Sequence, residues 1–407
     1  MKKFLFSSSG NYPGLPSREF FEFIIKRNRC RIIACNLYTT VMQSNDLLYK
    51  IALTLIPNIG DVLARNLVSY CGSVERIFKS RRHDLLRVPG IDEVRARSIL
   101  SFRDFKLAEA EMQFIEKNKI SVLFYLDEQY PTRLKGLTGS PVILYTKGNV
   151  QLNKGRMIAI VGTRHASEYG KSITETLVED LKQYDVTILS GLAYGIDVCA
   201  HRAAVAHGIP TVGVLGHALN RLYPSQHRSI AVKMLENGGL VTEFKSSDPF
   251  DRENFPKRNR IVAGLADATI VIESAVKGGA LITAEIANSY NRDVFAVPGR
   301  VGDKYSEGCN YFIKSNKANL VECANDVAYL SGWIDKKFVP SKQKEIFIEL
   351  NEQEKVIVAV LTTTQAIHVD EISRLSNQFG SKLAASLLGL EFKGVVNALP
   401  GKLYKLS

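Results

Sequence analysis

The stretch MIAIVGTRHASEYGKSITETLVEDLKQYDVTILSG, residues 157–191, decides the fold class of this chain. It opens and closes with a short, almost wholly apolar run, and an amphipathic helical pattern lies between the two runs. Two buried strands joined by a helix form a βαβ unit, from which parallel sheets are built. The stretch therefore predicts a domain of the α/β class.

The same alternation of strand and helix continues beyond this stretch. Short runs rich in β-branched residues recur at 211–216, 240–244, 268–273, 293–299 and 319–324, with helical patterns between them. Such alternation is typical of a doubly wound sheet with helices on both faces. We expect a Rossmann-like, doubly wound parallel sheet over residues 116–330.

A different pattern, of short helices, fills residues 46–115. Two turns that contain Pro and Gly, IPNIG at 56–60 and VPGID at 88–92, each stand between two helices. Such turns stop one helix and start the next with open backbone N–H groups. The arrangement resembles a tandem helix-hairpin-helix (SAM-like) unit, which can present these groups to DNA phosphates. A purely structural helical bundle fits the sequence equally well.

Three further segments flank these two regions. Residues 1–45 carry no clear period, and we expect a poorly structured leader with Met42 as the natural start. Residues 331–350 are polar and rich in lysine, which predicts a linker. Residues 351–407 contain three helical patterns and a hairpin with Pro400-Gly401 at its turn, which predicts a winged helix.

The composition favours an intracellular protein with a polyanionic partner. Lys and Arg total 53 against 41 Asp and Glu, a formal net charge of +12, and a basic surplus attracts phosphates. No apolar run is long enough to cross a membrane, and the N-terminal one is too short for a signal peptide. The six cysteines form no CxxC pair, so we expect reduced thiols and no metal site in a cytoplasmic protein.

Residues suited to phosphate binding follow the first two strands, and ligands of open parallel sheets bind beyond the carboxyl ends of strands. Gly162, Thr163 and Arg164 follow the first strand and offer close backbone approach, a hydroxyl donor and a bidentate guanidinium. Ser190 and Gly191 follow the second strand at the head of a helix, where free N–H groups attract anions. We expect both clusters to bind phosphates.

Two more clusters are expected at the same edge of the sheet. The run FPKRNR, residues 255–260, holds three cations in four positions, and Phe255 could stack on bases. In GGALITAE, residues 278–285, two glycines open a helix with Thr283 on its first turn. A charge run is often only a solvated helix face, but the coincidence of four clusters favours binding. The predicted nucleic-acid-binding residues here are Phe255, Lys257, Arg258, Asn259, Arg260, Gly278, Gly279 and Thr283.

Two common nucleotide motifs are not met. A dinucleotide fingerprint needs GxGxxG after the first strand, where this chain reads GTRHASEYG. The tripeptide Gly170-Lys171-Ser172 suggests a P-loop, but that motif needs glycine at the position of His165. The sequence therefore predicts neither NAD nor ATP as a cofactor.

Taken together, the motifs resemble those of the DNA-processing protein A (DprA/Smf) family. The resemblance runs through YPTRL, PVILYTKGN, IVGTR, SGLAYGID, YPSQH, NFPKRNRIVAGL, GGALITAEIA and VPGR, from residue 46 to 335. It implies a protein that binds single-stranded DNA, protects incoming DNA during natural transformation and helps load the RecA recombinase. It also implies a homodimer formed through the α/β domain, and a binding protein rather than an enzyme.

Two other function classes compete with this interpretation. A nucleoside-monophosphate phosphoribohydrolase of the lysine-decarboxylase-like group shares a related fold, and Glu285 would be its catalytic base. A scaffold that binds no nucleic acid is the other, but it would leave the four clusters without a ligand. Helix 381–393 of the predicted winged helix offers only Lys382 and Lys393 as cations, which favours protein contact over groove reading.

Overall fold

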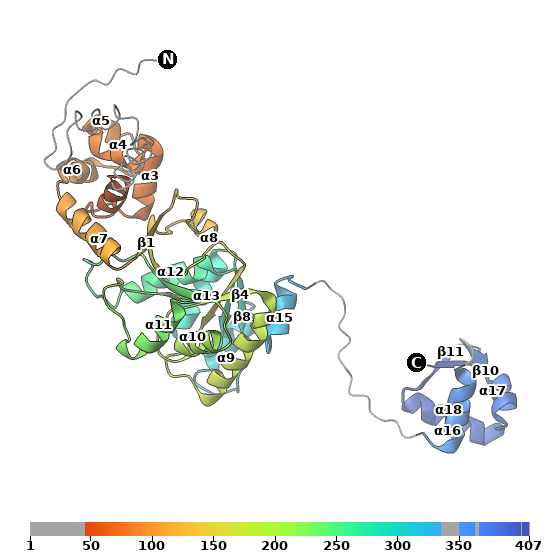
Figure 1. Ribbon diagram of the computed structural model, residues 1–407. Helices are drawn as coiled ribbons and strands as arrows, with labels where there is room; N and C mark the ends of the chain where they lie inside the picture. The colour runs from red at the N-terminus through yellow and green to blue at the C-terminus, as the bar shows by residue number, and fades with distance from the viewer. Residues whose placement is uncertain (1–44, 335–349, 363–365, 400, 407) are drawn as a thin grey trace, which may run out of the picture. The chain divides into compact units, whose positions relative to one another are not determined.

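The computed structural model describes residues 45–334, 350–362, 366–399 and 401–406 (Figure 1). The chain divides into two compact units, Met1–Asp335 and Lys336–Ser407, and each is treated by itself. The predicted leader up to residue 44, with Met42, and most of the predicted linker, residues 335–349, lie outside the described residues.

The described part of the first unit begins with short helices. They are a helix at 45–53, α3 (Asp61–Cys71), α4 (Val74–Lys79), α5 (Arg82–Leu85), α6 (Glu93–Ser101) and α7 (Phe105–Lys117). Side chains of Ser73 and Asp92 accept hydrogen bonds from backbone N–H groups in the first turns of α4 and α6. The predicted turn at 56–60 lies between the helix at 45–53 and α3, and the one at 88–92 lies between α5 and α6, as expected.

A nine-stranded sheet follows. Its strands are β1 (Ser121–Phe124), β2 (Ile143–Gly148), β3 (Arg156–Val161), β4 (Val186–Ser190), β5 (Thr211–Val214), β6 (Gly238–Thr242), β7 (Ala268–Val271), β8 (Asp293–Ala296) and β9 (Asn319–Leu320). Their order is β1-β2-β6-β5-β4-β3-β7-β8-β9. All seven predicted strands are present, which confirms an α/β fold with a mostly parallel sheet.

The predicted strands are parallel to one another, but the sheet carries two further strands at one edge that are antiparallel. β1 pairs with β2 and β2 pairs with β6, and both pairings are antiparallel. The remaining neighbours, from β6 through β9, are parallel. β1 and β2 precede the first βαβ unit and are joined to each other without a crossover over the sheet, so nothing requires them to run parallel.

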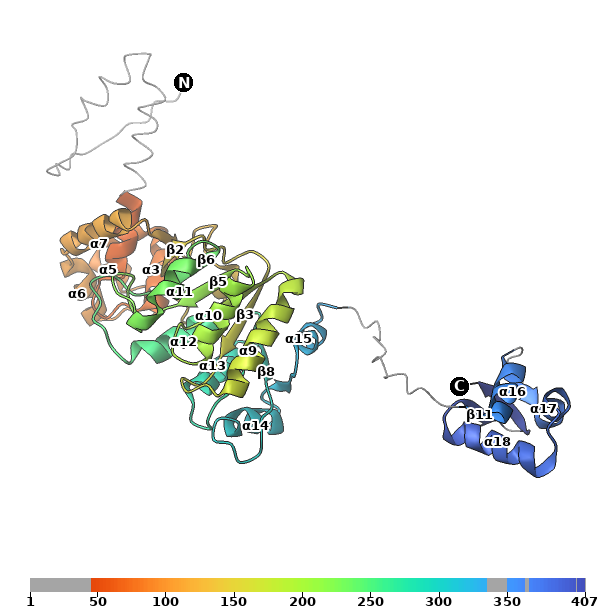
Figure 2. The same ribbon diagram turned by 60° about the horizontal axis from the view of Figure 1, so that its bottom comes forward.

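Helices cover both faces of the sheet (Figure 2). They are α8 (Thr132–Lys135), α9 (Glu168–Leu181), α10 (Ile196–Ala206), α11 (Arg228–Met234), α12 (Asn254–Leu265), α13 (Gly279–Ser289), α14 (Glu307–Lys314) and α15 (Ala324–Leu330). Ile158 and Ile160 of β3 share a core with α9, α10 and α15. Met157 and Ala159 share the opposite core with α12, α13 and α14. This alternation along one strand is what burial on both faces demands.

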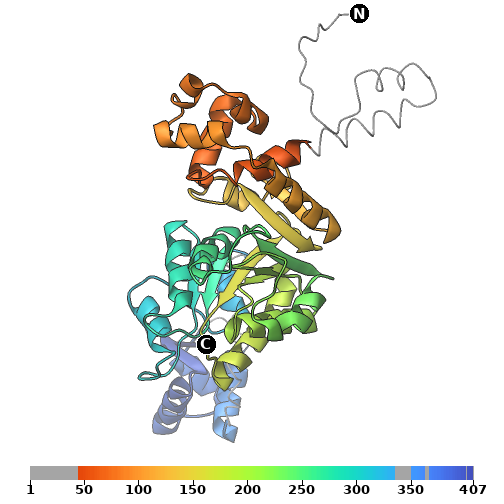
Figure 3. The ribbon, with the colours of Figure 1, turned by 90° about the vertical axis from the view of Figure 1, so that its left-hand side faces the viewer.

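The helices of residues 45–117 share one core with the antiparallel edge of the sheet. Their buried apolar side chains, such as Leu67 and Ile99, belong to the same cluster as Phe124 of β1 and Tyr145 of β2. Figure 3 shows the red and orange helices packed against the yellow strands. The helical part and the sheet therefore form one continuous folded body.

The second unit combines helices with a small antiparallel sheet. Its elements are α16 (Glu352–Leu361), β10 (Ile367–His368), α17 (Val369–Ser376), α18 (Gly380–Phe392), β11 (Val396–Leu399) and β12 (Leu403–Leu406). The sheet order is β10-β12-β11. Ile357, Ile372 and Leu387 lie in its core. The helical patterns and the pairing of β11 with β12 agree with the expectation, while β10 was not predicted.

Candidate nucleic-acid interface

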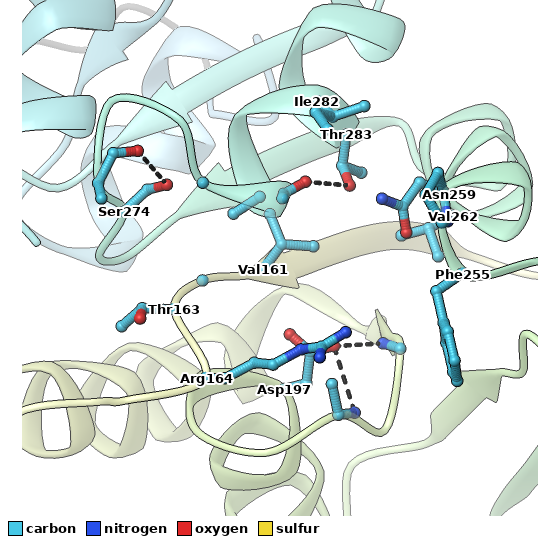
Figure 4. Close-up of a pocket in the computed structure, with 18 of the residues that line it drawn as sticks. Val161, Thr163, Arg164, Asp197, Phe255, Asn259, Val262, Ser274, Ile282 and Thr283 are labelled. Carbon is cyan, nitrogen blue, oxygen red and sulfur yellow. Dashed lines mark hydrogen bonds between the residues drawn. The ribbon is translucent and has the colours of Figure 1, made fainter. Parts of the chain in front are cut away.

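A cleft of about 290 Å³ opens at the carboxyl edge of β3, β4 and β7 (Figure 4). Ten of the predicted binding residues line it: Gly162, Thr163, Arg164, Gly191, Phe255, Arg258, Asn259, Gly278, Gly279 and Thr283. Ser190, Lys257 and Arg260 do not line the cleft. Four clusters that are far apart in the sequence thus meet at one edge of the sheet, where parallel sheets bind their ligands.

The loop after β3 forms one wall. Gly162 has no room for a side chain, because a Cβ there would lie 2.4 Å from the Ile196 side chain. The Thr163 backbone N–H donates to the Glu273 carbonyl at 2.7 Å, which fixes the loop against the end of β7. The Arg164 guanidinium lies 5.9 Å from the centre of the Phe255 ring, and Figure 4 shows it reaching across the cleft. Arg164 is thus placed to meet an anion.

The loop after β4 differs from the predicted anion seat. The N–H groups of Gly191 and Ala193 donate to the Asp197 carboxylate, at 3.1 and 3.4 Å. Ser190 is fully buried, and its hydroxyl donates to the Ile160 carbonyl at 2.6 Å. The chain's own carboxylate therefore occupies these amides. Sequence reasoning missed Asp197, although an acidic residue in the first turn of a helix often binds the N–H groups there.

Arg258 is buried, lines the cleft and interacts electrostatically with Asp197, which lines it too. A Cβ on Gly191 would lie 2.3 Å from the Arg258 guanidinium, so a side chain there would displace the guanidinium. The guanidinium also donates to the Val214 carbonyl. Burial lowers the pKa of Arg258 to about 10 despite the opposing charge of Asp197, and it raises the pKa of the Asp197 carboxyl despite Arg258. Arg258 therefore still carries its positive charge at neutral pH.

The run FPKRNR lies in the first two turns of α12, which begins at Asn254. Phe255, Arg258, Asn259 and Val262 follow helical spacing and line the cleft. Lys257 is exposed and lies outside the cleft lining. Three cations that are adjacent in sequence thus point in different directions around the helix, because each residue turns by about 100°.

The N-terminus of α13 is open toward the cleft. Gly278 precedes the helix, and no side chain caps it. A Cβ on Gly279 would meet no atom within 4 Å, so the first turn faces free space. Thr283 is buried and lines the cleft. Because α13 begins at Gly279, Thr283 lies in the second turn of the helix and not in the first, as was predicted. An uncapped helix N-terminus with its dipole directed at the cleft attracts an anion.

The N-terminus of α9, directly after β3, is closed. The Ser167 hydroxyl accepts a hydrogen bond from the Gly170 N–H at 3.0 Å. The buried Glu273 carboxylate accepts from the Ser167 N–H at 3.0 Å and from the Ser167 hydroxyl. A dinucleotide would seat its diphosphate at this helix in a Rossmann fold. Here a carboxylate fills the position, in agreement with the absence of the glycine fingerprint.

Arg260 lies in a second polar site, which we call the seam, where α3 meets the sheet. Its guanidinium pairs with Asp61 at 3.3 Å and with Glu243. Asp61 also accepts a hydrogen bond from the Val142 N–H at 2.9 Å. Burial raises the pKa of the Glu243 carboxyl to about 7, which Arg260 only partly opposes. Arg260 therefore holds the helical part on the sheet rather than lining the cleft.

The two Pro-Gly turns are engaged within the protein. The first leads into α3, whose first residue, Asp61, belongs to the seam. In the second, Asp92 accepts from the Arg95 N–H at 2.9 Å, and the Arg95 guanidinium donates to the Gly90 carbonyl at 3.2 Å. Both turns are therefore held by contacts inside the protein.

Glu285 does not line the cleft. It lies exposed on α13 and pairs with Lys317 at 3.1 Å. The carboxylate that lines the cleft is Asp197, which is buried and engaged with two amides. The geometry therefore gives the phosphoribohydrolase alternative no catalytic base where it was expected.

Other side chains of the described residues offer no metal site. No group of three or more His, Cys, Asp or Glu gathers in this part of the chain. Four cysteines are described, Cys71, Cys199, Cys309 and Cys323, and all have free thiols. Among the same residues, no helix combines the length and the apolar character needed to cross a bilayer.

Known protein families match both the helical region and the sheet region of the first unit. Residues 121–332 match the family described as DNA recombination-mediator protein A, and residues 50–103 match the SAM-like helix-hairpin-helix tandem. The second match confirms the helix-hairpin-helix prediction as a fold.

Individual relatives show the same likeness. Protein Smf of Escherichia coli is 32% identical over 327 residues, which cover 79% of this chain and 87% of that protein. DNA processing protein DprA of Streptococcus pneumoniae is 35% identical over 240 residues, 59% of this chain and 84% of that protein. The X-ray structure of DprA from Streptococcus pneumoniae superimposes with a TM-score of 0.60 at 31% identity, covering 70% of this chain and 97% of that one.

Proposed function

The chain belongs to the DNA recombination-mediator protein A family, and from this premise we propose that it binds single-stranded DNA in the cleft. Membership gives it a role in DNA processing as a recombination mediator. The finer proposal concerns which nucleic acid it holds, and with which residues.

The observation that carries the proposal is the pairing of a cationic wall with an open helix N-terminus. Arg164 lies on one side of the cleft, and the uncapped start of α13 lies on the other (Figure 4). Both can bind phosphate oxygens, and phosphate contacts carry no sequence information. A flexible single strand can follow such a groove, while its bases remain free to stack. We propose that Gly162, Thr163, Arg164, Arg258, Asn259, Gly278, Gly279 and Thr283 form the phosphate-binding surface.

The cellular role that we propose follows from the family resemblance. The protein protects incoming single-stranded DNA during natural transformation and helps load the RecA recombinase onto it. It acts in the cytoplasm as a homodimer formed through the α/β region. The net charge of +12 supports a polyanionic partner.

We propose that the chain is a binding protein and not an enzyme. Asp197 is engaged with the amides of Gly191 and Ala193, and Glu285 lies outside the cleft. Neither carboxylate is in a position to act as a general base on a bound ligand. The family match does not favour the phosphoribohydrolase alternative.

For the second unit we propose a winged helix that contacts protein. The order of three helices and an antiparallel pair, β11 with β12, supports this assignment. α18 would be the recognition helix, and Lys382 is its cation within the helix. We propose domain limits at 46–115, 116–330 and 351–407, with a linker at 331–350.

Fluorescence anisotropy with labelled single-stranded and duplex oligonucleotides tests the cleft. We expect the wild type to prefer the single strand and to bind it more weakly as salt increases. Arg164→Ala should weaken binding and reduce the salt slope by about one unit, the value for one lost phosphate contact. Arg202→Ala removes an equal charge from the exposed side of α10 and is the matched control.

Equal binding of duplex and single strand by the wild type would contradict the preference that we propose. Unchanged affinity and salt slope in Arg164→Ala, with the control behaving identically, would remove the cleft from the proposal.

A further inference from the structure

Three partly exposed aromatic side chains gather at one end of the cleft. Tyr194, Tyr223 and Phe250 have 38%, 45% and 40% of their surface exposed. They come from three different loops, after β4, after β5 and after β6. Single exposed apolar residues are common on protein surfaces, but a contiguous group of exposed aromatic rings is typical of a binding site.

The aromatic cluster is continuous with the cleft. A small hollow beside the cleft is lined by Tyr194, Tyr223 and Pro224 together with Arg164, Gly191, Ala193 and Phe255. The last four residues also line the cleft. A chain of nucleotides that leaves the Arg164 wall would therefore pass directly over these rings.

The rings are held in place by the rest of the fold. The Tyr194 hydroxyl donates to the Gln226 side chain at 2.9 Å, and the Tyr223 N–H donates to His217 Nε2 at 3.2 Å. Burial lowers the pKa of His217, so its ring is neutral and can accept that bond. The Tyr223 ring centre lies 5.3 Å from that of Phe250 and 5.8 Å from that of Phe255. Such preorganisation reduces the entropy lost on binding.

We propose that Tyr194, Tyr223 and Phe250 form a platform on which unpaired nucleobases stack while the neighbouring phosphates occupy the cleft. The inference rests on the proposed function, and it adds a base-binding subsite of stated chemistry. Aromatic faces accept any base, so the platform would not select a sequence. It would select against duplex DNA, whose bases already stack on one another. The platform therefore gives a physical origin to a preference for single strands, which the cationic wall alone does not.

Comparison of a thymidine oligonucleotide with an abasic oligonucleotide of equal length isolates the platform. Both carry the same phosphates, and only the first offers bases to stack. We expect the wild type to bind the thymidine strand about 5- to 100-fold more tightly, the range that stacking of one base or more provides. The double variant Tyr223→Leu, Phe250→Leu should bring that ratio close to one without changing the affinity for the abasic strand. Its salt slope on either strand should match that of the wild type.

Two further variants keep the test decisive. Tyr70→Leu removes an exposed tyrosine from α3, away from the cleft lining, and should leave the ratio unchanged. If the double variant fails to fold, Tyr194→Leu replaces it, and Tyr223→Trp should preserve the ratio by keeping an aromatic face.

The outcomes separate this inference from the proposed function. A wild type that binds neither oligonucleotide overturns the proposed function, and the platform with it. A wild type that binds both equally well, or a variant that loses the same factor on both, overturns the platform alone and leaves the phosphate-binding cleft standing.

Discussion

The cleft and the seam are each built around one arginine of α12, and the two arginines stand only two positions apart. Arg258 lies beside Asp197 and lines the cleft, while Arg260 pairs with Asp61 and Glu243 where the helical part meets the sheet. Both guanidiniums are largely withdrawn from water, but Arg260 pairs with the Glu243 carboxylate, while Arg258 donates to the Val214 carbonyl. The first site lies in the open cleft, whereas the guanidinium of the second is bound by carboxylates of α3 and of the segment after β6.

A run of cations in the sequence is therefore not a single patch on the surface. Helical rotation sends Arg258 toward the sheet edge, Arg260 toward α3 and Lys257 into solvent. The run FPKRNR therefore contributes to binding, to assembly of the fold and to surface charge at once. Substitutions in the two regions should separate these roles.

The largest effect is expected at Arg258. Arg258→Ala removes a large buried side chain, its hydrogen bond to the Val214 carbonyl and the positive charge that opposes the raised pKa of Asp197, and truncation of a large buried side chain costs about 2–5 kcal/mol. The free energy of unfolding, measured in urea, should fall by that amount, and affinity for single strands should fall as well. Arg258→Ala combined with Asp197→Asn should recover part of the stability but not the binding. If Arg258→Ala were as stable as the wild type, the buried guanidinium would have no role in the stability of the fold.

A smaller effect, confined to the seam, is expected from Glu243→Gln. Burial raises the pKa of Glu243 from 4.5 to about 7, so the folded chain keeps a proton that the unfolded chain releases. The stability from this proton is present below pH 4.5 and is lost as the pH rises through about 7. Glutamine resembles the protonated form at every pH.

Glu243→Gln should therefore gain stability relative to the wild type as the pH rises, by on the order of 2–3 kcal/mol near pH 8. Urea unfolding of both proteins from about pH 5 to about pH 8 measures this gain, and binding to single strands should not change. Glu253→Gln alters an exposed glutamate at the start of α12 and should track the wild type. Parallel pH profiles for Glu243→Gln and the wild type would argue that the seam carboxyl is ionised throughout.

The smallest effect is expected at Lys257, which belongs to neither region. Its side chain is exposed and does not line the cleft, and exposed substitutions usually change free energies by no more than about 0.5 kcal/mol. Lys257→Ala should change the dissociation constant for a single strand by less than about twofold. Anisotropy beside Arg164→Ala measures the contrast. A loss as large as that of Arg164→Ala would place the DNA over the outer face of α12.

The central strands were predictable from sequence because they are apolar on both faces, as β3 and β4 are. The antiparallel β2 was not placed in advance, since PVILYTKGN lies before the first βαβ unit and carries no crossover helix. Most of the cleft was also predictable, because glycines and cations follow the strands that build it.

What sequence reasoning could not supply was the direction of side chains and the internal partners of the predicted seats. Asp197 and Glu273 fill two helix N-termini that composition alone leaves open. Arg260 was assigned to the cleft because its partner, Asp61, lies far away in the sequence. Such long-range pairings appear only once the chain is folded.

The continuous core of the first unit bears on the order in which the chain can mature during translation. The helices of residues 45–117 leave the ribosome before the sheet, yet their apolar face is completed only by Phe124 of β1 and Tyr145 of β2. These two strands come next in the chain and pair with each other. Contacts between segments that are close in sequence form faster than distant ones. The amino-terminal body can therefore shield its hydrophobic surface early in synthesis. β2 then offers its free edge to β6, with which it pairs. The cleft is completed later, when α13 has been synthesised.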